Sequence, residues 1–251
     1  MKNRVDSSGQ PDRRVGLGPF WAIVQADLRS LFRNRITYGW LLVAIFIQVV
    51  RTLGSQTTTD LSAVVSSGLG DFIYIWALVI IGLAASSVSS EAGELADSVM
   101  SKSVTRVDYV LAKFASRITY TLVVFSIVTA VLVGMGLKLE AGDYNGLGLA
   151  SAILLVALAL VMLTTLGVGF SIAMPNTVMA IVTLLVLWYS MTALFPAIGL
   201  GFLSPGSLLG MLPNVIKGTW SQEGWETVGG FATVSIVSAV LSSAYFYLKD
   251  I

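Results

Sequence analysis

Several apolar runs of about 20 residues divide this 251-residue chain, and they constrain its fold more than any other feature. A helix of about 20 apolar residues crosses the hydrocarbon core of a bilayer. Only 12% of the residues are charged, against about 25% in soluble domains, and the mean hydropathy is +0.83. Strands of a membrane barrel need only about 10 residues each, with strict alternation. The sequence therefore predicts an all-α, polytopic membrane protein.

An amphipathic helix is expected before the membrane domain. Residues 1–18 are polar, with Gly, Pro and Ser, and predict a flexible cytoplasmic N-terminus. In 19–35, apolar residues such as Val24 and Leu28 follow helical spacing, while Arg29 lies off their stripe. Aromatic and aliphatic residues on one face and arginines on another are typical of a helix that lies in the membrane interface. A short soluble helix is the alternative.

The remaining residues, 36–251, are expected to form a transmembrane domain with six helical spans. The run of small residues that ends the second span indicates close helix packing. The apolar loop 199–226 contains the stretch FLSPGSLLGML, which predicts a short helix dipping into the interface. The expected spans are about 36–53, 69–90, 114–137, 147–173, 178–198 and 228–248.

Positive charge predicts the orientation of these spans. With six spans, both termini lie on one side, and that side carries twelve of the 15 Lys and Arg residues, against three on the other. Because cytoplasmic loops carry the excess of Lys and Arg, both termini are expected in the cytoplasm and the protein in the cell membrane.

The composition excludes several kinds of chemistry. The chain has no histidine and no cysteine, so most metal sites, histidine proton relays and disulfides are excluded, and we expect no catalytic, cofactor or metal residues. A net charge of +1 gives no basic patch for nucleic acid. We expect no charged residue near the middle of a span, which argues against proton coupling. Arg51 and Asp71, at the outer ends of the first two spans, are expected to pair as an exposed ion pair of little stabilising effect.

The segment 91–113, EAGELADSVMSKSVTRVDYVLAK, is one of the few places where charged residues cluster between apolar spans. Residues 91–100 predict a short cytoplasmic helix, because Leu95 and Val99 share one face. Thr105, with Asp108 three residues later, resembles a capping box, so a second helix should begin there and continue into the third span. A partner outside the membrane can contact this segment.

The segment and the order of spans resemble the permease subunits of ABC-type exporters, in the six-span class called type V or ABC-2-like. The nitrous oxide reductase maturation permease is one such relative. The loop after the second span in this class reads roughly Glu-x-x-Gly-Thr, Leu-Leu-Ser-x-Pro-Val-Ser-Arg and Gly-Lys. Six positions match that pattern, namely Glu91, Gly93, Ser101, Val104, Arg106 and Lys113. Six positions depart from it, namely Glu94, Val99, Met100, Ser103, Thr105 and Ala112. These departures bear on the assignment to a subfamily and not on the assignment to the class.

The resemblance implies that residues 91–102 form a coupling helix that docks on a separate ATPase subunit. This chain lacks a Gly-x-x-x-x-Gly-Lys-Ser/Thr loop, so ATP and magnesium are expected on the partner and the chain itself is not an enzyme. A second permease copy, identical or similar, is expected in the bilayer, and the output is export or transmitted force. The expected coupling residues are Glu91, Gly93, Glu94, Leu95, Asp97, Ser98, Val99, Ser101, Lys102 and Arg106.

The alternative from another class is a membrane protein that is not driven by ATP. A sodium-coupled carrier can hold its ion with backbone and hydroxyl oxygens, so the lack of buried carboxylates weighs less against it. An immunity-type or scaffold membrane protein is a further alternative in this class. Intact ATPase binding after charge reversal at Glu94 and Asp97 would count against the permease.

Overall fold

A computed structural model describes residues 18–54, 60–89, 105–139 and 143–248 of the chain. These ranges are helical and contain no strand. Two 3₁₀ turns, η1 (Pro196–Ile198) and η2 (Gly201–Leu203), join two of the helices. The α-helices are α1 (Pro19–Arg33), α2 (Arg35–Gly54), α3 (Leu61–Tyr74), α4 (Trp76–Ala85), α6 (Arg106–Leu139), α7 (Gly146–Ala173), α8 (Thr177–Leu194), α9 (Pro205–Ile216) and α10 (Gln222–Leu248).

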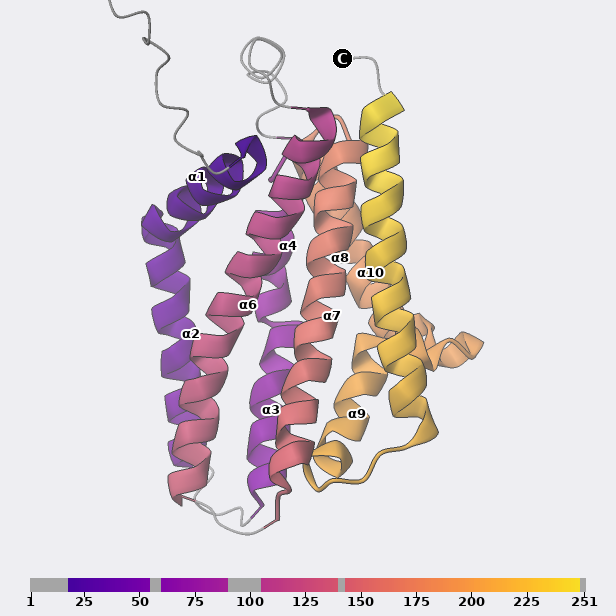
Figure 1. Cartoon of the computed structure of the whole chain (residues 1–251). Helices are drawn as coiled ribbons and strands as arrows, with labels where there is room; N and C mark the ends of the chain where they lie inside the picture. Colours follow the sequence, from indigo (N-terminus) through magenta and orange to yellow (C-terminus); the bar gives the residue numbers. More distant parts are fainter. Residues whose placement is uncertain (1–17, 55–59, 90–104, 140–142, 249–251) are drawn as a thin grey trace, which may run out of the picture.

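Six helical stretches in the described residues are long and apolar enough to cross a membrane, as the sequence predicted. The second of them, Leu61–Ala85, consists of α3 and α4 in series. The interfacial position of α1 stays a prediction, although its residues form the expected helix. Figure 1 shows α1, the start of α6 and the end of α10 at one end of the bundle, which we call the terminal end. The opposite end is the distal end.

The second span is the most buried of the six. In the second span 67% of the most apolar stretch is buried, whereas in the sixth span only 17% of the corresponding stretch is buried. Large apolar side chains on α2 and α10, such as Phe46 and Leu241, are more than half exposed. In a single chain these faces need an apolar surrounding, which is what a bilayer supplies.

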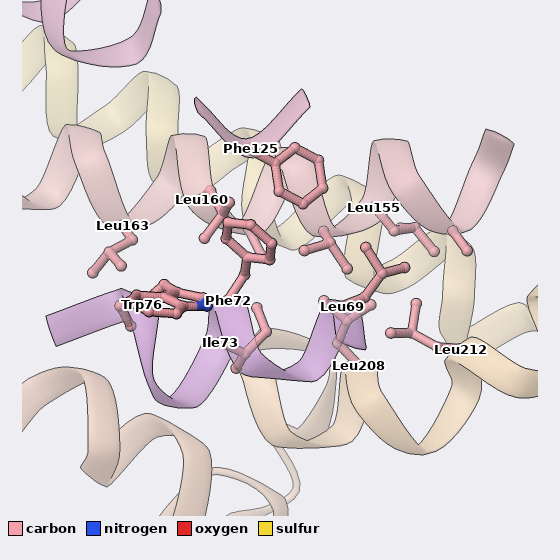
Figure 2. Close-up of a cluster of buried hydrophobic side chains, with 14 of the residues drawn as sticks. Leu69, Phe72, Ile73, Trp76, Phe125, Leu155, Leu160, Leu163, Leu208 and Leu212 are labelled. Atoms are coloured by element: carbon pink, nitrogen blue, oxygen red, sulfur yellow. The ribbon is translucent and has the colours of Figure 1, made fainter. Parts of the chain in front are cut away.

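The main core surrounds the second span (Figure 2). Phe72 of α3 and Phe125 of α6 meet edge to face, with 4.8 Å between ring centroids. Leu208 and Leu212 of α9 are fully buried in the same cluster. The helix expected to dip into the interface therefore packs inside the bundle, against α3 and α7.

Close packing between α4 and α7 confirms the interpretation of the small-residue run. A Cβ built on Gly167 of α7 would lie 2.4 Å from the Cβ of Ala84 in α4. Ala84 and Ala85 are themselves buried. Small side chains thus bring these two helices into backbone contact, as they do in membrane helix pairs.

The second span starts eight residues earlier than predicted, at Leu61 rather than 69. Its first turns contain several Ser residues, which suggested a polar loop. However, Leu61, Val64, Val65 and Leu69 follow helical spacing, and all four are buried. This face packs into the core, and its burial favours a helix over the polar loop that the Ser residues suggested.

A break at Ile75 separates α3 from α4 in the middle of the second span. The N–H of Leu78 donates to the Ile75 carbonyl (3.2 Å), a three-residue step that marks a tightened turn. Two side chains of α8 satisfy carbonyls beside the break. Trp188 Nε1 donates to the Ile73 oxygen (2.9 Å), and the Tyr189 hydroxyl donates to the Tyr74 oxygen (2.6 Å). The break is therefore stabilised by α8 rather than by Pro or Gly.

Candidate functional site

The candidate site is the terminal end of the bundle, from which the predicted coupling segment leaves and to which it returns. Arg106 is the first residue of α6 and is half-buried. The other predicted coupling residues lie outside the described residues, and their roles stay predictions. These are Glu91, Gly93, Glu94, Leu95, Asp97, Ser98, Val99, Ser101 and Lys102. The described residues on both sides show how the segment is attached.

The return of the chain into the bundle is capped by Thr105, as the sequence predicted. The Asp108 N–H donates to Thr105 Oγ1 (3.1 Å), which satisfies one unpaired donor of the first turn of α6. The Thr105 hydroxyl donates to Asp108 Oδ2 (2.7 Å). The Asp108 carboxylate also lies in the first turn, where the helix dipole favours negative charge. The start of α6 is thus fixed directly after the segment.

The departure of the chain from the bundle is held by hydroxyl groups. After α4 ends, the N–H groups of Val88 and Ser89 both donate to Ser171 Oγ of α7, at 2.9 Å each. Ser89 Oγ also bonds to Thr177 Oγ1 at the start of α8 (2.7 Å). The residues that follow the second span are therefore joined to α7 and α8.

A buried ion cluster joins α1 to α6 at the same end. The Asp27 carboxylate in α1 lies 3.1 Å from Lys113 Nζ and 3.5 Å from Arg117 Nη2, and it accepts a short hydrogen bond from Ser116 Oγ. The side chains of Asp27, Lys113 and Arg117 are each 9% exposed or less. Lys113 also lies over the Tyr109 ring, 5.5 Å from its centroid. Such a buried cluster strongly couples the helices that share it.

The sequence analysis missed Asp27, although a signal was present. Asp27 lies three residues after Val24 and four before Leu31, both buried, so it belongs to the apolar stripe of α1. A carboxylate on such a stripe needs a cationic partner. Lys113 and Arg117, at i and i+4 on α6, supply it.

A chain of hydrogen bonds ties α2 to the same unit. Trp40 Nε1 donates to the Tyr120 hydroxyl oxygen (3.1 Å), the Tyr120 hydroxyl donates to Thr37 Oγ1 (3.1 Å), and the Thr37 hydroxyl donates to the Leu31 carbonyl (2.7 Å). Tyr120 is 2% exposed. The hydroxyls of Tyr120 and Thr37 each accept one hydrogen bond and donate another. This connected series holds α1, α2 and α6 together as one unit.

The distal half contains a second polar group, formed by α2 and α3. Arg51 Nη2 lies 2.8 Å from Asp71 Oδ1, which confirms the predicted pair. Gln48 Nε2 donates to Asp71 Oδ2 (3.1 Å) and to the Gly68 carbonyl (3.2 Å). The predicted exposed position was wrong, because the Asp71 side chain is only 8% exposed.

The expectation that no charged residue lies near the middle of a span was also wrong for the second helical stretch. Asp71 is ten residues into the second span, about 15 Å along its axis, because that span begins at Leu61. An ionised group that is this buried needs partners, and Arg51 and Gln48 provide them.

At the distal rim, Asp143 connects three elements. It accepts from the N–H (3.1 Å) and hydroxyl (2.5 Å) of Ser62 in the first turn of α3, and it pairs with Lys217 (3.2 Å) after α9. Burial by itself raises the pKa of the Asp143 carboxyl group. The hydrogen bonds from Ser62, together with the hydrogen bond and the positive charge of Lys217, lower this pKa by more, so it lies below its ordinary value. Asp143 thus caps α3 from another part of the chain.

At the terminal end, ion pairs and hydroxyl hydrogen bonds connect α1 to α6, α2 to α6, and the residues after α4 to α7 and α8. Within the described residues, no three His, Cys, Asp or Glu side chains lie close enough to hold a metal ion. No protein-family model and no curated protein sequence matches the chain. The function is therefore inferred from the geometry of the chain and from the resemblance of its 91–113 segment.

Proposed function

We propose that the chain is the transmembrane (permease) subunit of an ATP-driven ABC transporter of the six-span exporter class. It couples to a separate ATPase through the segment between its second and third spans. The observation that carries the proposal is the attachment of both flanks of that segment. Ser89 is bonded to α7 and α8, and Thr105 caps α6, so a push on residues 90–104 reaches helices on both sides.

Force delivered to the start of α6 would also move α1 and α2. The Asp27 cluster joins α1 to α6, and the bonds of Tyr120 join α2 to α6. A buried ion cluster resists separation because parting it would leave charges without partners in a low-dielectric site. Displacement of α6 would thus carry α1 and α2 with it.

The same proposal places the protein in the cell membrane with both termini in the cytoplasm, since twelve of its 15 basic residues belong to that side. A second permease copy and lipid would cover the exposed apolar side chains of α2, α8 and α10, such as Leu42, Val186 and Val240. ATP and magnesium bind the partner ATPase. The output is export of a substrate or force on a partner beyond the membrane.

Co-purification tests the proposal. The chain is expressed with the ATPase encoded beside it, solubilised in mild detergent and assayed for a stable complex with ATPase activity. Glu94→Lys with Asp97→Lys should abolish the complex. The matched control, Asp60→Lys with Glu226→Lys, reverses two exposed carboxylates at the distal end and should retain it. A complex that survives the first pair of changes would contradict the proposed docking segment.

A carrier driven by an ion gradient is the second candidate, favoured by the position of Asp71 inside a span and by the break at Ile75. Interrupted helices and intramembrane carboxylates are typical of ion-coupled carriers. Proteoliposomes that hold the chain alone distinguish the candidates. Substrate movement driven by a proton or sodium gradient and lost in Asp71→Asn would support the carrier, whereas a requirement for the ATPase and ATP would support the permease.

A further inference from the structure

A polar pocket of about 330 Å³ opens beside the Arg51–Asp71 pair. Its walls come from α2, α3 and α9, and they include both charged residues together with hydroxyl and apolar groups. The pocket is large enough for a small polar group, since ligand sites begin at roughly 300 Å³. The lining residues are Arg51, Ser66, Ser67, Gly70, Asp71, Tyr74 and Leu209.

Arg51 is fixed in the pocket but keeps donors for a ligand. Its Nη2 donates to Asp71 and its Nη1 to Ser67 Oγ (2.9 Å), which together use two of the five guanidinium N–H groups. The side chain remains 30% exposed. Because Ser67 Oγ accepts from Arg51, its own hydroxyl proton is available to a ligand anion.

Asp71 supplies the opposite charge at the same wall. Each of its oxygens accepts one hydrogen bond, from Arg51 and from Gln48, and a carboxylate has about four lone-pair sites. The neighbouring residue Tyr74 is 43% exposed. An aromatic face attracts an ammonium group within about 6 Å. The pocket therefore offers an anion site at Arg51 and Ser67 and a cation site at Asp71 and Tyr74.

Charge balance selects the class of ligand. The pocket carries one cation and one anion, on helices long and apolar enough to cross a membrane, so its net charge is zero. A ligand with net charge would add an uncompensated charge in a low-dielectric site, which costs several kcal/mol. A ligand that carries both charges leaves no net charge there and can engage both partners.

We propose that this pocket binds a zwitterionic group that carries a phosphate and an ammonium, as in the headgroup of phosphatidylethanolamine. The phosphate lies against Arg51 and Ser67, and the ammonium lies against Asp71 and Tyr74. Leu209 adds an apolar side chain to the pocket wall, which suits an amphiphile that approaches from the distal end. The proposal concerns binding by this chain alone and does not depend on an ATPase.

Native mass spectrometry of the delipidated full chain tests it with three lipids of equal acyl chains. These are phosphatidylethanolamine, anionic phosphatidylglycerol and a cationic trimethylammonium lipid. The zwitterion should bind about tenfold more tightly than either charged lipid, since each charged lipid loses one charge-assisted contact. Arg51→Gln with Asp71→Asn removes both charges together, leaves neither partner unpaired, and should abolish the preference.

Two further variants test the pocket while the Arg51–Asp71 ion pair stays in place. Ser67→Ala removes one donor, and Gly70→Ala narrows the pocket, since its Cβ would lie 3.6 Å from Leu209, an ordinary contact. Both should weaken phosphatidylethanolamine binding several-fold, whereas Gly82→Ala, where nothing lies within 4 Å, should not. The proposal is overturned if phosphatidylglycerol binds as tightly as phosphatidylethanolamine, or if the double variant keeps the preference.

Competition with soluble phosphoethanolamine shows whether the pocket recognises the zwitterionic headgroup alone or the whole lipid. Displacement of the bound lipid by millimolar phosphoethanolamine assigns recognition to the headgroup, so that a free zwitterion is also a ligand. Retention of the lipid in its presence, with the preference for the zwitterionic lipid intact, assigns the site to the whole lipid. Because no ATPase is present, failure of this experiment leaves the proposed coupling to an ATPase untouched.

Discussion

The carboxylate of Asp27 in α1 lies 3.1 Å from the ammonium of Lys113 in α6, and both side chains are 9% exposed or less. Arg117 approaches the same carboxylate. Asp27 is the carboxylate that both cations share, so its removal breaks two buried ion pairs between α1 and α6 at once.

Asp27→Asn should therefore destabilise the protein by about 3 kcal/mol or more, the usual effect of breaking a buried ion pair. Thermal unfolding in detergent would show this as a lower midpoint, and limited proteolysis would show earlier cleavage within α1. Arg29→Ala, at an exposed position on the same helix, should change neither. An unchanged midpoint in Asp27→Asn would mean that the cluster does not hold α1 to α6.

Trp188→Phe tests the support of the break in the second span. It keeps an aromatic ring but removes the donor to the Ile73 carbonyl, leaving a buried acceptor unpaired. The expected loss is about 1–3 kcal/mol in unfolding free energy. Trp225→Phe changes a residue that is 66% exposed and should have no measurable effect. Equal midpoints for both variants would contradict the proposed support.

Gly167→Ala should separate α4 from α7. The added methyl group would lie 2.4 Å from the Cβ of Ala84, which cannot rotate away, so the helices must shift. We expect a loss of about 1–3 kcal/mol, as for other overpacked sites, measured by thermal unfolding. Gly134→Ala adds the same atom where nothing lies within 4 Å and should be neutral or slightly stabilising.

The Asp143 cap predicts a pH dependence. Its pKa is held below the ordinary value of 3.8, so the folded state binds this proton less readily than the unfolded state. The stabilisation is present at pH values above 3.8 and is lost as pH falls through the lower pKa of the folded state. The difference in melting temperature between wild type and Asp143→Asn should therefore be constant from pH 7 to about pH 5 and shrink below about pH 4. A difference that grows in acid would contradict the assignment.

Much of the fold was predictable from hydropathy, because only helices and closed barrels satisfy their backbone groups within a bilayer, and apolar runs of about 20 residues indicate helices. The start of the second span was not, since Ser residues at 62, 66 and 67 obscured the buried spacing of Leu61 and Val65. The break at Ile75 has no Pro or Gly beside it, and its support comes from Trp188 and Tyr189, more than a hundred residues away.

The site was predictable only where its signal was local. The capping box of Thr105 and Asp108 is contained within four residues, and the structure confirms it. The ion cluster depends on Asp27 and Lys113, which are 86 positions apart and come together only when α1 packs on α6. No local pattern shows which cation a buried carboxylate will find.

Site-directed photo-cross-linking at residue 94 tests the central proposal most directly. The chain has no cysteine, so Glu94→Cys introduces a single thiol for a benzophenone maleimide. In membranes that contain the ATPase encoded beside the chain, irradiation should yield a covalent product of the two subunits. The same label at Asp60→Cys, at the distal end, should yield none. A product at neither position, or equal yields at both, would contradict docking of an ATPase on this segment.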